Sequence, residues 1–93
     1  MTVAEQLEQL QHRIVAGSVS GDDTEQELRA LLTAFEHVGG SEHYRENIEQ
    51  AISWAKVYAS QAKASWRGPD RVRQFLVQHM TVAANWAKQL ETA

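Results

Sequence analysis

Hydrophobic residues recur along the first part of the chain at intervals of three and four, which is the period of one face of an α-helix. The first such series is Val3, Leu7, Leu10 and Ile14. Thr2 precedes the series and Glu5 follows Thr2 by three residues, an arrangement typical of a helix N-terminus. We therefore predict a helix from Thr2 to Ala16, ended by the glycines and serines of residues 17–21.

The same period returns after this break and predicts a second helix. Asp22 or Asp23 is suited to cap it, and acidic residues in its first turn are favoured by the helix dipole. Its apolar face consists of Leu28, Leu31, Leu32, Phe35 and Val38. Gly39–Gly40 ends the helix, and we expect Gly39 to take the left-handed conformation that terminates many helices.

Two longer helices are predicted in the second half. Ser41 is the expected cap of the third helix, which could run to Arg67, and the fourth runs from Pro69 to about Leu90, since proline suits a first helical position. The apolar face of the third helix is Tyr44, Ile48, Ala51, Ile52, Ala55, Tyr58, Ala59, Ala62 and Trp66. That of the fourth is Val72, Phe75, Leu76, His79, Ala83, Trp86, Ala87 and Leu90.

The pattern predicts an all-α fold. No segment shows the alternation that indicates a strand. Four helices with short connections favour a small antiparallel four-helix bundle, in which helices 1 and 2 are shorter than helices 3 and 4. The 93 residues suffice for a single helical domain, 1–93.

Composition narrows the possible classes of protein. The chain is 43% hydrophobic and 23% charged, which is typical of a folded globular domain. It has no cysteine, which excludes disulfides, thiolate catalysis and cysteine-based metal sites. No apolar run approaches the length of a membrane span, and Glu5 and Glu8 argue against a signal peptide. We expect a cytoplasmic protein that does not bind membranes.

Charge is unevenly distributed along the chain. Residues 1–50 hold ten acids and three bases, whereas residues 51–93 hold two acids and six bases. In an antiparallel bundle the acidic turn between helices 1 and 2 lies beside the basic turn between helices 3 and 4. The basic patch consists of Lys63, Arg67, Arg71 and Arg73. We expect the two turns to neutralise each other; the alternative is a patch that binds nucleic acid or an acidic partner.

No motif in the chain points to catalysis. The four histidines, His12, His37, His43 and His79, lack the Glu-x-x-His spacing of metal sites in helical bundles. A helix-turn-helix over residues 31–51 would place one arginine against two glutamates in its reading helix, which disfavours nucleic acid. We expect no catalytic residue, no metal and no cofactor.

Apolar and flanking residues outside the predicted core faces form two stripes on the long helices. They are Trp54, Val57, Gln61 and Ala64 on the third helix, and Val77, Met80 and Ala84 on the fourth. Stripes on adjacent helices predict an interaction surface, unless helices 1 and 2 cover them. Because a small domain can extend its core by pairing with itself, we expect a homodimer.

The sequence therefore favours a non-enzymatic protein–protein interaction module. Such a protein is a small adaptor, inhibitor or regulator that presents the surfaces of helices 3 and 4 to a protein partner. The alternative is a small nucleic-acid-associated regulator that uses the Lys63–Arg73 basic turn. The two differ in salt dependence, because phosphate contacts weaken steeply as salt rises.

Overall fold

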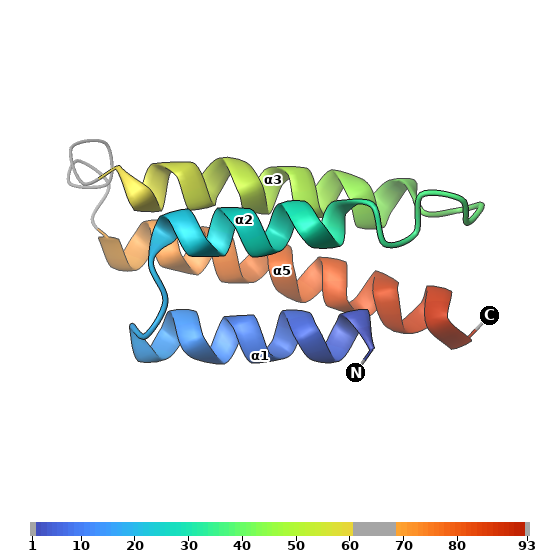
Figure 1. The fold of residues 1–93 in the computed structure, drawn as a ribbon, viewed down its shortest axis with the longest axis horizontal. Helices are drawn as coiled ribbons and strands as arrows, with labels where there is room; N and C mark the ends of the chain where they lie inside the picture. Colours follow the sequence, from blue (N-terminus) through green and yellow to red (C-terminus); the bar gives the residue numbers. More distant parts are fainter. Residues whose placement is uncertain (1, 61–68, 93) are drawn as a thin grey trace.

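The computed structural model describes residues 2–60 and 69–92, which form four helices running up, down, up and down (Figure 1). They are α1 (Val3–Ala16), α2 (Gly21–Leu32), α3 (Glu42–Ala59) and α5 (Pro69–Thr92). The first two have 14 and 12 residues and the last two have 18 and 24, so the first two are the shorter pair, as predicted. No strand occurs among the described residues, and the all-α bundle is confirmed.

The helices do not pack equally against their neighbours. α3 packs on α5 and on α2, and α1 packs on α5, whereas α1 and α2 scarcely touch. An ion pair of 2.6 Å between Arg13 and Glu27 links α1 to α2. The two ends of the chain lie at the same end of the bundle (Figure 1), where the Ala4 N–H donates to Glu91 Oε1 at 3.2 Å.

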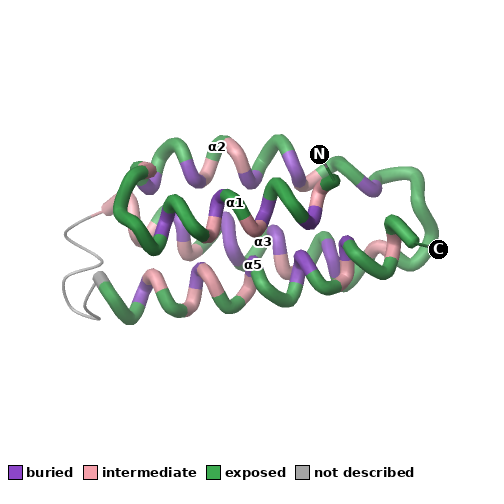
Figure 2. The backbone as a smooth tube through the Cα atoms, turned by 90° about the horizontal axis from the view of Figure 1, so that it is seen from below, coloured by how far each residue is buried: buried purple, intermediate pink, exposed green. Residues whose placement is uncertain are grey.

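The buried residues of all four helices face the middle of the bundle (Figure 2). The largest fully buried side chains are Tyr44, Leu7, Leu10, Ile14, Leu28, Ile48, Leu76, Met80, Val72 and Thr24. Thr24 is polar, and its hydroxyl donates to the Ser20 carbonyl at 2.7 Å. Among the described residues, every buried side-chain nitrogen or oxygen has a hydrogen-bond partner.

The predicted cap of α1 is confirmed and that of α2 is wrong. Thr2 Oγ1 accepts the Glu5 N–H at 3.1 Å. In α2 the cap is Ser20, whose Oγ accepts the Asp23 N–H at 3.1 Å, rather than Asp22 or Asp23. The helix therefore begins at Gly21, one residue earlier than an Asp22 cap would place even the cap itself.

Gly21 is the closest approach of α2 to α3. A Cβ built on Gly21 would lie 2.5 Å from the backbone N of Ala59 and 2.6 Å from its Cα. Both distances are shorter than a non-bonded contact allows. The distance between the two helices at this end therefore depends on the absence of a side chain at position 21.

Tyr44 joins the same two helices at the opposite end. Its hydroxyl is buried and donates to the Leu31 carbonyl at 2.5 Å, and its ring meets the edge of Phe35 with centroids 4.8 Å apart. α2 ends at Leu32 and not at Val38, so the predicted end is wrong. Residues 33–38 form successive tight turns, which keep Phe35 buried and leave Val38 exposed. Gly40, not Gly39, has the positive φ, at 82°.

The ends of the long helices also differ in part from the prediction. α3 ends at Ala59 rather than at Arg67, because Ser60 is extended with φ −94° and ψ 98°. Ala59 is also the residue that the start of α2 meets, at Gly21. Ala62 and Trp66 lie outside the described residues. α5 begins at Pro69, as expected, and continues to Thr92.

We expect Gly21→Ala to lower the free energy of unfolding by about 1–3 kcal/mol, the usual cost of overpacking. The added Cβ would overlap the Ala59 backbone. Gly39→Ala is the matched control, since a Cβ there meets nothing within 4 Å. Urea denaturation followed by circular dichroism measures both variants. Equal stability of the two would mean that α2 and α3 are further apart than described.

A second prediction concerns alkaline pH. Burial, and to a lesser extent the Glu91 carboxylate, raises the pKa of the Tyr44 phenol above its ordinary value. Above about pH 10 the unfolded chain loses this proton while the folded protein keeps it, so stability falls as pH rises. Tyr44→Phe should cost about 1 kcal/mol at neutral pH by losing the hydrogen bond. It should also flatten the decline in urea midpoint above about pH 10. An unchanged decline would contradict this.

Candidate protein-binding surface on α3 and α5

The predicted interface residues of α5 are mostly covered by α1. Met80 is 0% exposed and Ala84 is 3% exposed, so their assignment to a surface is wrong. Val77 is half-buried, and its carbonyl accepts from Gln11 Nε2 at 3.0 Å. This contact shows that α1 covers the side of α5 that the sequence pattern assigned to the surface.

The predicted interface residues of α3 have a different environment. Trp54 and Val57 are half-buried, and each keeps part of its side chain accessible. Gln61 and Ala64 lie outside the described residues. The accessible part of the predicted surface therefore includes Trp54 and Val57, and its neighbours on α5 differ from the predicted ones.

Three side-chain contacts join α3 to α5 beside these residues. Trp54 stacks on Phe75 with ring centroids 4.7 Å apart. His43 stacks on Trp86 with centroids 4.8 Å apart. Between them, His79 Nδ1 lies 3.3 Å from Asn47 Oδ1. Phe75, His79 and Trp86 were predicted to be core residues, but they are half-buried and contact α3 at the border between the two helices.

These contacts belong to a continuous stripe, which we name the α3–α5 seam. It consists of His43, Asn47, Gln50, Trp54 and Val57 on α3, and Phe75, His79, Val82 and Trp86 on α5. All nine residues are half-buried or exposed. Their spacing alternates between four and three in both helices, which is the signal in the sequence that would have identified the stripe.

The α3–α5 seam contains no aspartate, glutamate, lysine or arginine, although 23% of the chain is charged. Two other helix contacts carry ion pairs. Arg13 and Glu27 join α1 to α2 at 2.6 Å, and Lys88 and Glu8 join α1 to α5 at 2.8 Å. The seam thus differs in chemistry from these two edges of the bundle.

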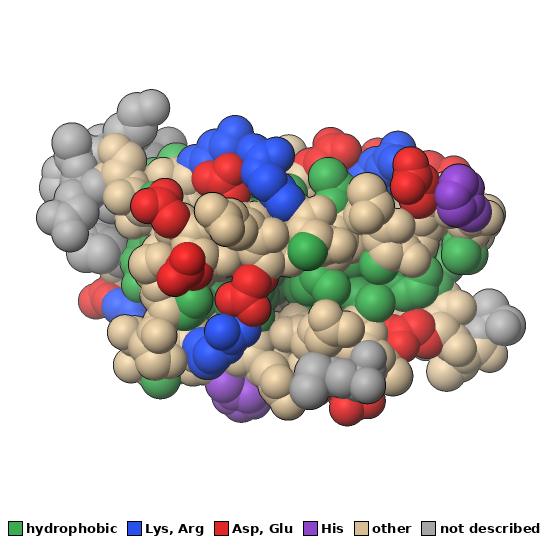
Figure 3. Space-filling view, in the orientation of Figure 1, with side chains coloured by type: hydrophobic (Ala, Val, Ile, Leu, Met, Phe, Trp, Pro, Cys, Tyr) green, Lys and Arg blue, Asp and Glu red, His purple; other side chains and the backbone are tan. Residues whose placement is uncertain are grey.

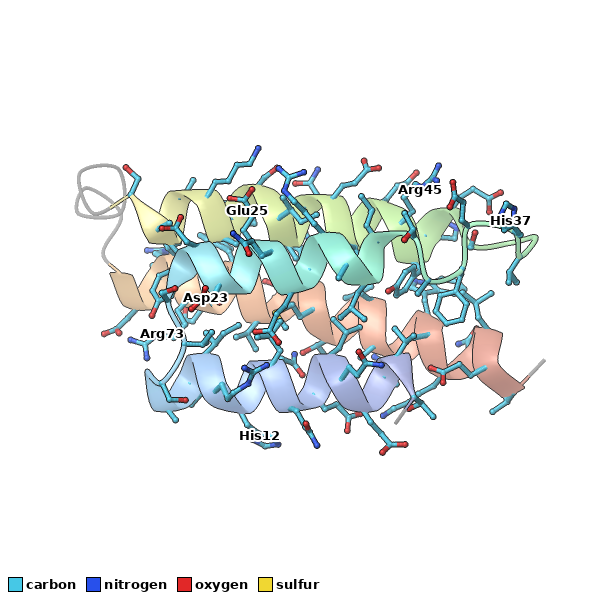
Figure 4. All side chains as sticks on the ribbon, viewed as in Figure 1. His12, Asp23, Glu25, His37, Arg45 and Arg73 are labelled. Carbon is cyan, nitrogen blue, oxygen red and sulfur yellow. The ribbon has the colours of Figure 1, made fainter. Side chains whose placement is uncertain are left out.

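The predicted basic patch is only partly within the described residues, since Lys63 and Arg67 lie outside them. Arg71 is exposed. Arg73 donates to Asp70 Oδ1 at 2.5 Å and to the Val15 carbonyl at 3.4 Å. Asp23 and Arg73 lie toward the same end of the bundle (Figure 4), as expected.

The expected neutralisation between the two turns takes another form among the described residues. Glu25 pairs with Arg29 at 2.8 Å within α2, and Glu27 pairs with Arg13 of α1. Arg73 pairs within its own helix, with Asp70. These charges are therefore paired within one helix or between α1 and α2, and not between the two turns.

A groove of about 390 Å³ runs between α1 and α2, on the face shown in Figure 3. Leu10 and Leu31 form part of its lining, and the Arg13–Glu27 pair lies at its rim. Leu10 is 1% exposed and Leu31 is 8% exposed, so the apolar floor is almost covered. The groove therefore offers a partner much less apolar surface than its volume suggests.

The histidines are not gathered into a site. His12 lies on α1 and His37 lies between α2 and α3, far from each other (Figure 4). Within the described ranges, no three histidine, aspartate or glutamate side chains are grouped closely enough to hold a metal ion. None of the helices in those ranges combines the length and the apolarity that crossing a membrane requires.

Comparison of the chain with protein-family models, curated proteins and solved structures gave no match. The candidate binding surface is therefore identified from the residues of the α3–α5 seam themselves. These residues are partly exposed, include Trp54, Phe75 and Trp86, and carry no formal charge apart from any proton gained by a histidine.

We expect the Trp54–Phe75 stack to contribute to stability. A double-mutant cycle with Trp54→Ala and Phe75→Ala should give a coupling of about 0.5–1.5 kcal/mol, the usual value for an aromatic pair. The cycle isolates the pair from other contacts of either ring. Urea denaturation of the four proteins measures the coupling. A value near zero would show that the rings do not stack in solution.

Proposed function

We propose that this protein is a non-enzymatic protein–protein interaction module, an adaptor, inhibitor or regulator, and that the α3–α5 seam is its binding surface. The observation that carries the proposal is the uncharged, partly exposed aromatic stripe along both long helices. The cores of protein interfaces are depleted in charged residues and enriched in aromatic ones. Tryptophan is also frequent among the residues that dominate binding energy.

A second copy of the chain is the occupant that we propose for the seam. The protein has a net charge of −3, so most pairings of two copies bring like charges together. The seam avoids this repulsion because it has no carboxylate, ammonium or guanidinium group. Pairing would remove the partly exposed rings of Trp54 and Trp86 from water in both copies.

The nucleic-acid alternative has less support. Of the basic patch, Arg73 is engaged with Asp70 and the Val15 carbonyl, and Arg71 is the exposed arginine within the described part of α5. Phosphate binding of useful strength needs several basic side chains acting together.

We expect Val82→Glu to weaken self-association at least about tenfold, since it places a charge in a desolvated interface. Val82 is 37% exposed, so the monomer should keep its fold. Sedimentation equilibrium over a concentration series measures the association, and circular dichroism measures the helix content.

Val15→Glu is the matched control. It makes the same substitution on α1, at a valine that is 63% exposed and lies outside the seam. We expect it to self-associate like the wild-type protein. A wild-type protein that stays monomeric throughout the series, or equal weakening by both substitutions, would contradict the proposal.

A further inference from the structure

Charge is separated along the α3–α5 pair, although the seam itself is neutral. Residues 42–50 of α3 contain three acids, Glu42, Glu46 and Glu49, and one base, Arg45. At the other end, the second half of α3 contributes Lys56, and residues 69–80 of α5 contribute Arg71 and Arg73 against Asp70. One end of the pair is therefore acidic and the other end is basic.

The charges on the remaining part of α5 are engaged with α1. Lys88 pairs with Glu8 at 2.8 Å, and Glu91 accepts the Ala4 N–H at 3.2 Å. Both contacts lie on the side of α5 that faces away from the seam. Since these α5 charges face α1, the carboxylates of α3 are the charges that border the seam at the end where α3 begins.

We infer that two copies pair through the seam in an antiparallel manner, so that the acidic end of each copy lies on the basic end of the other. The inference rests on the proposed function, and it specifies the arrangement of the partner. A two-fold axis perpendicular to the helices exchanges the ends of the pair, whereas an axis parallel to them would bring like ends together. Charge complementarity selects the first arrangement.

Glu46 and Arg71 are the side chains at the borders of the seam that carry this selection. Glu46 follows His43 by three residues, and its carboxylate lies 4.0 Å from His43 Nδ1. Arg71 precedes Phe75 by four residues, on the same side of α5. Both are exposed, and within the described residues Arg71 has no carboxylate at ion-pair distance. In the antiparallel dimer, Glu46 of each copy lies toward the end of the other copy that carries Arg71.

Charge reversal tests the arrangement. Glu46→Lys and Arg71→Glu each replace two attractive contacts in the dimer by two repulsive ones, and each should weaken self-association about tenfold at low salt. An equimolar mixture of the two variants should restore wild-type affinity, because both pairs in the mixed dimer are again of opposite sign. The double variant carrying both substitutions should also recover. Sedimentation equilibrium measures all four proteins, and added salt should reduce the differences.

Several results would overturn the inference. A mixture that associates no better than the single variants excludes the antiparallel arrangement. Stronger association of Arg71→Glu with wild-type protein than of wild-type protein with itself would indicate a parallel dimer instead. If Val82→Glu abolishes association while both charge reversals leave it unchanged, the seam remains the interface and only the arrangement is wrong. A monomeric wild-type protein removes both proposals.

Discussion

The buried hydrogen bond from the Tyr44 hydroxyl to the Leu31 carbonyl joins the last turn of α2 to the first turn of α3. Because it is buried, removing either partner would leave the other polar group without a hydrogen bond inside the core. Gly21 against Ala59 fixes the other end of the same helix pair. α2 is thus held along α3 at two points, whereas the exposed Arg13–Glu27 ion pair to α1 contributes little. The burial of α1 therefore depends on α5.

The number, order and relative lengths of the helices could be predicted from the sequence, because local signals determine them. Thr2, Gly17 and Pro69 act on the adjacent backbone alone. The end of α2 could not be predicted in the same way. Its last turn bonds Tyr44, which is 13 residues from Leu31 in the chain and meets it only after α2 and α3 pack. The end of α3 at Ala59 likewise coincides with a tertiary contact, that with Gly21.

The candidate surface shows the same division. The pattern placed Trp54 on the flank of the apolar face of α3 and Val57 further from it, and both residues are half-buried. The sequence pattern could not show which apolar residues of α5 face the core and which lie at the border with α3. Since α1 packs on α5, Met80 and Ala84 enter the core, and Phe75, His79 and Trp86 move to the border with α3. Helical periodicity shows which residues share one face of a helix. The direction in which that face points depends on how the helix packs against its neighbours.

The pairing of α1 with α5 also constrains the order of folding during synthesis. α1 is the first of the four helices to leave the ribosome, and a 14-residue helix on its own is marginal in water. Its sequence neighbour α2 offers it little contact, and its main partner α5 is the last of the four to be translated. A nascent chain can pair α2 with α3 early, while Leu7, Leu10 and Ile14 stay exposed until α5 emerges. The step that completes the core is then the packing of α1 on α5, which brings together the two helices that are furthest apart in the sequence.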